Sequence, residues 1–280
     1  GLLMICKTES TLQHEIELVH MAKSFGLDAE VLSRKETEEM EPNVQYNMAG
    51  SVYFGCDAWM TPNVFMREFK EKLEQAGVKF QYNTQLDRII HKAGKIDKII
   101  TSKGELTADE YVLAAGSWSP ILMKQLKVDI PLQAGKGYSF TLPSPVVMPK
   151  LPSILTEGRV ATTPMIHGLR IAGTMEIAGT GLNINERRVQ GIIKSVKEFM
   201  PQFEEQDFSQ IETWAGLRPC TPDGLPYIGR TKKYKNLLIG TGHAMLGFTL
   251  GPITGQMLSS EIMGEKPSIV SPLLDIERFA

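Results

Sequence analysis

An arginine and a run of glycines near the C-terminus are the residues best suited to chemistry. Residues 214–256 read WAGLRPCTPDGLPYIGRTKKYKNLLIGTGHAMLGFTLGPITGQ. Arg218 lies at the end of a predicted strand, and a guanidinium can hold a carboxylate through two parallel hydrogen bonds. The glycines after the apolar residues 237–239 let backbone N–H groups approach a flat or anionic ligand closely. We therefore expect this stretch to bind a carboxylate next to such a ligand.

Composition narrows the classes of protein that could carry this site. The chain has 280 residues, 42% of them hydrophobic and 22% charged, which is typical of a globular protein. A formal net charge of -2 argues against nucleic acid as a partner, because that needs a basic surface. The cysteines Cys6, Cys56 and Cys220 lack metal-ligand spacing, which favours a cytoplasmic protein without a metal site. No apolar run reaches the roughly 18 residues of a membrane span, so we expect at most peripheral contact with the inner membrane.

Local signals predict the elements of the first 130 residues. Residues 1–8 indicate a strand, and a helix capped by Ser10 is expected to run to Phe25. Ser33 and Glu36 form a capping box at the start of a second helix. A third helix is expected to open at Thr61-Pro62 and to place Phe65, Phe69 and Leu73 on one face. Three further strand signals follow, at residues 78–82, in a hairpin over residues 88–101, and at residues 111–114.

The pattern changes after Pro131. Short segments with β-branched or alternating residues predict a largely antiparallel sheet. A helix is expected after Asn185, strands at residues 211–217 and 237–239, and a last helix over residues 254–263. Strand–helix alternation on both sides of a mainly antiparallel region indicates two interleaved domains.

Several of these stretches together resemble one family of enzymes. They are VLAAGSWSP, KGYSF, RIAGTME, WAGLRPCTPDGLPYIGR and GHAMLGFTLGPITG. In this order they are similar to the FAD-dependent D-amino-acid dehydrogenase/oxidase family, whose relatives include glycine oxidase and sarcosine oxidase. The resemblance spans essentially the whole chain, and it implies an oxidoreductase of amino-acid catabolism with FAD as its cofactor.

The resemblance implies an α/β (α+β) fold. A partial FAD-binding Rossmann-like domain would be interleaved with a substrate domain built on a largely antiparallel sheet. Residues 1–55 and 131–213 would form the substrate domain, and residues 56–130 and 214–280 the FAD-binding domain.

One part of the family pattern does not occur in the sequence. The family opens with a strand, the fingerprint G-x-G-x-x-G and a helix, followed by an acidic residue about 20 positions later. The nearest runs are Gly179-Thr180-Gly181 and Gly240-Thr241-Gly242, and neither fits. A family member would carry about 100 further residues before Gly1, enough for a complete βαβ unit. We therefore expect a C-terminal fragment whose own FAD site is incomplete.

The resemblance assigns the chemistry mainly to Arg218. Oxidation of an amino acid to an imine needs hydride transfer from Cα to the flavin, so the protein has to clamp the carboxylate and aim Cα. The arginine of the corresponding GLRP sequence does this in related oxidases. The alternative is a structural ion pair at a strand end.

The resemblance also implies a set of cofactor contacts. Residues 242–247 would lie against the pyrimidine edge of the flavin, where backbone amides and a helix dipole stabilise the anionic ring. His243 is expected to pack in this turn rather than to carry a proton. Gly216 stands where sarcosine oxidases have the cysteine that binds flavin, which indicates non-covalent FAD. The expected cofactor-binding residues are Leu86, Ala115, Gly116, Ser117, Trp118, Gly242, His243, Ala244, Leu246, Gly247, Phe248 and Thr249.

Met245 is the expected determinant of the substrate. Glycine oxidase-like members have an arginine at this place, so Met245 favours a bulkier or more apolar substrate than glycine. Related enzymes also place a tyrosine over the carboxylate, and residues 160–164 here contain none. Tyr53 and Tyr138 are substitutes by residue type, with core packing as the alternative for both.

These residues predict oxidative deamination of a D-amino acid, or of a cyclic or secondary amino acid such as D-proline or hydroxyproline. Oxygen and a membrane quinone are both open as the electron acceptor. One alternative is a catalytically silent fragment that folds or binds a carboxylate without FAD. The other is an oxidase of the glycine or sarcosine type.

Overall fold

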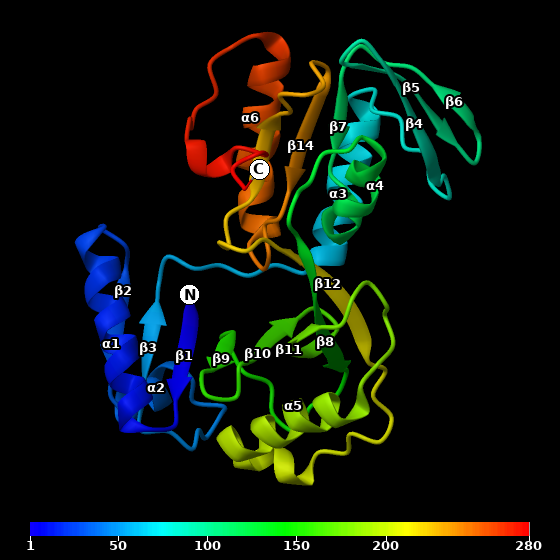
Figure 1. Cartoon of the computed structure of the whole chain (residues 1–280). Helices are drawn as coiled ribbons and strands as arrows, with labels where there is room; N and C mark the ends of the chain where they lie inside the picture. The colour runs from blue at the N-terminus through cyan, green and yellow to red at the C-terminus, as the bar shows by residue number, and fades with distance from the viewer. Residues whose placement is uncertain (280) are drawn as a thin grey trace. The chain divides into compact units, whose positions relative to one another are not determined.

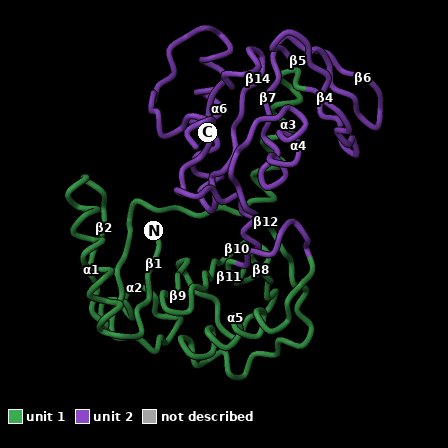
Figure 2. Tube along the Cα trace, in the orientation of Figure 1, with its two compact units in different colours: residues 1–78, 137–175, 183–216 green, residues 79–136, 176–182, 217–280 purple. Residues whose placement is uncertain are grey.

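The computed structural model describes residues 1–279, which fold into two compact units of mixed helix and sheet (Figures 1 and 2). Unit 1 contains residues 1–78, 137–175 and 183–216, and unit 2 contains residues 79–136, 176–182 and the chain from residue 217 onward. Each unit is thus built from segments far apart in the sequence. The α/β (α+β) fold class expected from the sequence is confirmed, and the bounds proposed for the two functional domains stay a prediction.

The core of unit 1 is built on an eight-stranded sheet in the order β12-β8-β11-β10-β9-β1-β3-β2. Strand β1 runs parallel to β9 and antiparallel to β3, and β2 and β10 both join by antiparallel pairing. The strand bounds are β1 Leu2–Cys6, β2 Ala29–Leu32, β3 Gly50–Phe54, β8 Gln133–Leu142, β9 Ser153–Leu155, β10 Val160–Met165, β11 Gly168–Ile177 and β12 Trp214–Cys220.

The helices of unit 1 are α1 (Glu9–Ser24), α2 (Arg34–Met40), α3 (Pro62–Gln75) and α5 (Glu186–Phe199), followed by the 3-10 turn η2 (Pro201–Glu205). Helix α5 contacts β9 and β10 and buries five residues of one face. Their spacing of three and four residues is that of an amphipathic helix, as the sequence predicts after Asn185. They are Val189, Ile192, Ile193, Val196 and Phe199.

Two helix starts in unit 1 differ in how well the sequence predicts them. The Ser33–Glu36 capping box is confirmed, with the Ser33 hydroxyl accepting from the Glu36 N–H and the Glu36 carboxylate accepting from the Ser33 N–H. Helix α1 is capped by Thr8, which accepts from the Thr11 N–H at 3.3 Å, so the expected cap at Ser10 is wrong. Thr8 is the residue with an extended backbone, which an N-cap requires.

The stretch from residue 61 to 82 is more exposed than its pattern indicates. Helix α3 starts at Pro62 as predicted, yet it buries no residue, and Phe65 and Phe69 of its apolar face stack with centroids 5.6 Å apart. Residues 78–82 form no strand. The rings of Phe80 and Tyr82 instead stack on each other, with centroids 5.9 Å apart. These alternating aromatic residues therefore form a ring pair and not a strand.

Unit 2 contains two three-stranded sheets. One has the order β13-β14-β7, formed by Tyr227–Arg230, Leu237–Thr241 and Tyr111–Leu113. The other has the order β4-β5-β6, formed by Leu86–Lys92, Lys95–Thr101 and Gly104–Leu106. The predicted hairpin between β4 and β5 is confirmed, because Ala93 and Gly94 both take the positive φ that a tight two-residue turn requires.

The remaining elements of unit 2 are η1 (Gly116–Trp118), α4 (Ser119–Gln125), α6 (Gly247–Met263) and η3 (Pro272–Leu274). Helix α6 begins seven residues before the predicted start at Thr254, and Pro252 lies inside it. A proline so close to a helix start removes a single bond of the ladder. The expected strand over residues 211–217 is shifted as well, since β12 begins at Trp214. No helix among residues 1–279 has the length and apolarity needed to cross a membrane.

Leu155 gives a test of the unit 1 core, because it is fully buried between β1 and β10. We expect Leu155→Ala to lower the free energy of unfolding by about 2–5 kcal/mol, since it removes apolar contacts and leaves a cavity. Leu18→Ala on the exposed side of α1 is the control and should change it by only about 0.5 kcal/mol. Urea unfolding curves measure both, and equal losses would contradict the core assignment.

Candidate functional site

Two of the stretches singled out in the sequence follow neighbouring parallel strands of unit 2. Residues 115–118 follow β7 and residues 242–249 follow β14, which pairs with β7 in parallel. The carboxyl ends of parallel strands lie at the same edge of a sheet, where ligands of such folds bind. The Thr241 hydroxyl donates to the Gly116 carbonyl at 3.2 Å, and the Ser119 hydroxyl donates to Thr241 at 3.4 Å. These bonds tie the two turns together.

The turn after β7 has room for a ligand and an unused polar group. Gly116 has a φ of +52°, and no atom outside Gly116 and its two neighbours in the chain lies within 4 Å of the place where a Cβ would stand. The Ser117 side chain is buried, and its hydroxyl has no hydrogen-bond partner among the described residues. Buried hydroxyls without a partner are uncommon in folded proteins, so this one fits a group that a bound cofactor supplies. Trp118 beside it is 47% exposed.

The turn after β14 packs closely against Thr221 at Gly242, and the side chains that follow Gly242 are exposed. Gly242 has a φ of +85°, and a Cβ there would lie only 2.6 Å from Cγ2 of Thr221. Ala244 also has a positive φ, of +46°, which is unusual for a residue other than glycine. Met245, Leu246 and Phe248 are 71%, 57% and 47% exposed. The turn therefore presents its backbone and apolar side chains outward.

Helix α6 starts inside this stretch at Gly247 and has no side-chain cap. The first N–H groups of a helix lack partners within it, and the helix dipole adds positive potential there. The end of α6 thus suits an anionic or electron-rich ligand, as the resemblance implies for residues 247–249.

His243 is held as a neutral imidazole. Its Nε2 lies 2.9 Å from the Thr254 hydroxyl, which itself donates to the Leu250 carbonyl at 2.8 Å. Because that hydroxyl has one hydrogen, Nε2–H must be the donor to it, and Nδ1 is the unprotonated nitrogen. Burial lowers the pKa of His243 below its usual value. These contacts agree with the packing role expected for His243.

Arg218 is half-buried on β12, and the end of that strand lies along the turn after β14. The Ala244 N–H donates to the Pro219 carbonyl at 3.0 Å, and Cys220 pairs with His243 in an antiparallel bridge. Burial lowers the pKa of the Arg218 guanidinium, which nonetheless stays charged at neutral pH. The last part of β12, from Leu217 onward, belongs to unit 2, and there it forms one hydrogen-bonded structure with the glycine turn.

The other predicted site residues lie elsewhere. Leu86 opens β4 in the separate sheet β4-β5-β6 and pairs with Thr101. Tyr53 lies on β3 and packs against the core of unit 1. Tyr138 lies on β8 in the same core, is 1% exposed, and its hydroxyl donates to the Asn183 carbonyl at 3.5 Å. Both tyrosines pack in the core of unit 1, which is the alternative named for them in the sequence analysis. Their roles toward a substrate stay a prediction.

Three hydroxyl residues that shape the site were not expected from the sequence. Thr241 and Ser119 directly adjoin the two predicted turns, so their positions next to Gly242 and Trp118 were a usable signal. Thr254 lies eleven residues after His243, and only the early start of α6 brings it within reach.

Comparison with known proteins agrees with this geometry. Residues 1–261 match the family described as "FAD dependent oxidoreductase", abbreviated DAO. The D-amino acid dehydrogenase of Granulibacter bethesdensis is 34% identical over 285 residues, which cover all of this chain and 68% of that protein. The D-amino acid dehydrogenase of Vibrio atlanticus is 35% identical, with all of this chain and 67% of that protein covered.

A solved structure supports the fold. The glycine oxidase of Geobacillus kaustophilus superposes with a TM-score of 0.88 at 20% identity, over 99% of this chain and 74% of that one. The predictions of the family and of FAD as its cofactor are confirmed. The buried hydroxyl of Ser117 and the open backbone at Gly116 fit that cofactor. The chain belongs to the DAO family of FAD-dependent oxidoreductases, which act as amino-acid dehydrogenases and oxidases.

Proposed function

We propose that this chain catalyses FAD-dependent oxidative deamination of a D-amino acid, or of a cyclic or secondary amino acid such as D-proline or hydroxyproline. Bound FAD supplies the hydride acceptor. The observation that carries the proposal is the bond from the Ala244 N–H to the Pro219 carbonyl. It fixes the strand of Arg218 against the turn proposed to face the cofactor.

Arg218 binds the substrate carboxylate and so orients Cα. A guanidinium fork that is half-buried grips a carboxylate more strongly than one in water, because fewer water molecules compete. Orientation of this kind supplies a large part of the rate of a hydride transfer. The neutral His243 adds no second positive charge beside this cation, which leaves the carboxylate to Arg218.

The name of the relatives and the identity of residue 245 support the substrate class. Two curated relatives at 34% and 35% identity are named D-amino acid dehydrogenase. Met245 is 71% exposed at the open side of the turn and provides an apolar surface for a side chain larger than that of glycine. Oxygen or a membrane quinone takes the electrons from the reduced cofactor.

The direct test is to incubate the purified chain with FAD, remove unbound FAD, and add D-amino acids without oxygen. Retained absorbance near 450 nm that fades with a D-amino acid, and not with its L-enantiomer, is the expected result. A protein that retains FAD but is not reduced by any amino acid would overturn the proposed reaction. A colourless protein would favour the silent, carboxylate-binding alternative for this chain.

Arg218→Ala should raise KM for the amino acid strongly. A buried, charge-assisted pair of hydrogen bonds contributes about 2–4 kcal/mol, which corresponds to a rise of about 30- to 1,000-fold. Arg88→Ala on the exposed strand β4 is the matched control and should leave KM unchanged. Steady-state kinetics with one D-amino acid measure both variants, and an unaltered KM for Arg218→Ala would remove Arg218 from the site.

Met245→Arg should shift the preference toward glycine, because it adds a positive charge and removes apolar surface beside the proposed pocket. Met263→Arg is the matched control, since Met263 is 70% exposed at the other end of α6. The ratio of kcat/KM for glycine to that for a larger D-amino acid is the measurement. An equal ratio in both variants would show that Met245 does not determine specificity.

A further inference from the structure

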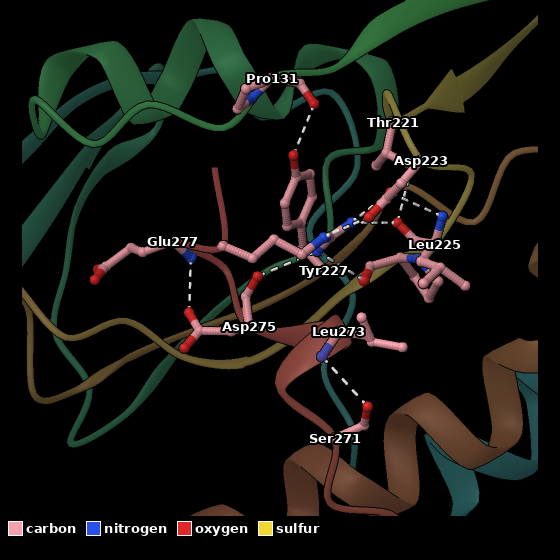
Figure 3. Close-up of polar contacts among 11 residues, drawn as sticks. Pro131, Thr221, Asp223, Leu225, Tyr227, Ser271, Leu273, Asp275 and Glu277 are labelled. Carbon is pink, nitrogen blue, oxygen red and sulfur yellow. Dashed lines mark hydrogen bonds and ion pairs between the residues drawn. The ribbon is translucent and has the colours of Figure 1, made fainter. Parts of the chain in front are cut away.

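The C-terminal segment, residues 271–279, is bound to the turn that follows β12. This segment begins with η3, whose Ser271 hydroxyl accepts from the Leu273 N–H. The turn consists of residues 221–226 and joins β12 to β13 within unit 2. Figure 3 shows Asp275 of the segment below Tyr227, with Glu277 bonded to Asp275, and Asp223 and Leu225 of the turn on the other side of Tyr227. The two pieces are about 50 residues apart in the sequence, so the contact is set by the fold alone.

Arg278 makes most of this contact and uses every donor of its guanidinium. Its Nε and Nη2 donate to the two carboxylate oxygens of Asp223, both at 2.9 Å. Its other N–H groups are satisfied by backbone carbonyls of Leu225 at 2.7 Å, Pro226 at 3.3 Å and Asp275 at 3.1 Å. The side chain is 8% exposed. An arginine with all five N–H groups paired and little exposure holds its partners in a single geometry.

Two aromatic rings and the charge of Asp223 also hold the Arg278 side chain in place. The guanidinium carbon lies 4.1 Å from the ring centroid of Tyr227 and 4.9 Å from that of Phe279. The Tyr227 hydroxyl donates to the Pro131 carbonyl at 2.8 Å, which anchors the ring from its far end (Figure 3). The Arg278 guanidinium holds the pKa of Asp223 down at about 2, so the pair is ionised throughout the neutral range.

The turn of residues 221–226, which Arg278 holds, also adjoins both parts of the proposed site. It follows Arg218 and Cys220 directly in the chain. It also packs under Gly242, where an added Cβ would lie 2.6 Å from Thr221 and 3.5 Å from both Pro226 and Tyr227. Any shift of the turn would therefore move the end of β12 and the turn after β14 against each other.

We propose that Arg278 is a positioning residue, which acts through Asp223 to keep Arg218 and the Gly242 turn in the geometry that substrate oxidation requires. Its effect on catalysis rests on the proposed function, whereas its effect on the backbone of the two stretches does not. Arg278 itself contacts neither Arg218 nor residues 242–249, and it lies outside the residues that the resemblance singles out.

A second anchor of the same segment provides a matched control. Lys232 pairs with Asp275 at 2.9 Å and with Glu277 at 3.7 Å, and its N–H donates to Glu277 at 3.1 Å. Lys232 lies between β13 and β14, away from the turn of Asp223 in the chain. Lys232→Met thus loosens the segment and leaves the Arg278–Asp223 pair in place.

Hydrogen–deuterium exchange on the purified chain, without FAD, is the first experiment. Arg278→Lys and Asp223→Asn should each speed exchange about tenfold in peptides that cover residues 214–220 and 238–248, because the bond from Ala244 to Pro219 opens more often. Peptides from α1 should be unchanged in every variant. Lys232→Met should speed exchange only in residues 271–279.

Two results would overturn the proposal. One is exchange that rises in residues 271–279 but stays at the wild-type rate in both site peptides of Arg278→Lys and Asp223→Asn. The other is an equal rise in the site peptides of Lys232→Met, which would reveal a general loosening. In FAD-loaded protein, Arg278→Lys should raise KM for the amino acid about tenfold with kcat changed less than twofold, since carboxylate alignment is lost first. If FAD is not retained, the proposed function fails and the exchange result still decides the role of Arg278.

Discussion

The parallel pairing of β7 with β14 is the constraint on which the site depends. Tyr111, Val112 and Leu113 pair in register with Leu237, Leu238 and Ile239. Parallel strands cannot be joined by a tight hairpin, so a long stretch of chain separates these two in the sequence. The same pairing brings their carboxyl ends to one edge, and with them the turns at Gly116 and Gly242. The hydroxyls of Thr241 and Ser119 then fix the distance between the turns.

Residues whose signals are local were predicted well from the sequence. The Ser33–Glu36 capping box, the Ala93-Gly94 turn and the helix after Asn185 depend on neighbours within a few positions. These features are correct because no distant segment competes with the local preference. Arg218 was expected at the end of a strand over residues 211–217, whereas the structure places it inside β12, two residues before the strand ends.

The errors and omissions have non-local causes. The start of α6 was placed too late because glycines and Pro252 read as a helix boundary, whereas the helix begins at Gly247 and contains Pro252. Phe80 and Tyr82 alternate like a strand, but the structure pairs their rings. The bond between Asp223 and Arg278 spans 55 positions, and nothing near either residue in the sequence indicates the other. Likewise, Thr254 reaches His243 only after α6 has formed.

Several basic side chains of unit 2 are paired with a carboxylate or have a lowered pKa. Arg278 pairs with Asp223, Arg230 pairs with Glu110, and burial lowers the pKa of His243. Two positive groups belong to the proposed site: the charged guanidinium of Arg218 on β12 and the partial charge at the start of α6. In the proposed function, the guanidinium holds the substrate carboxylate and the start of α6 faces the electron-rich ring. The positive φ of Ala244 costs about 1–3 kcal/mol, and the bond from its N–H to the Pro219 carbonyl holds the residue in that conformation.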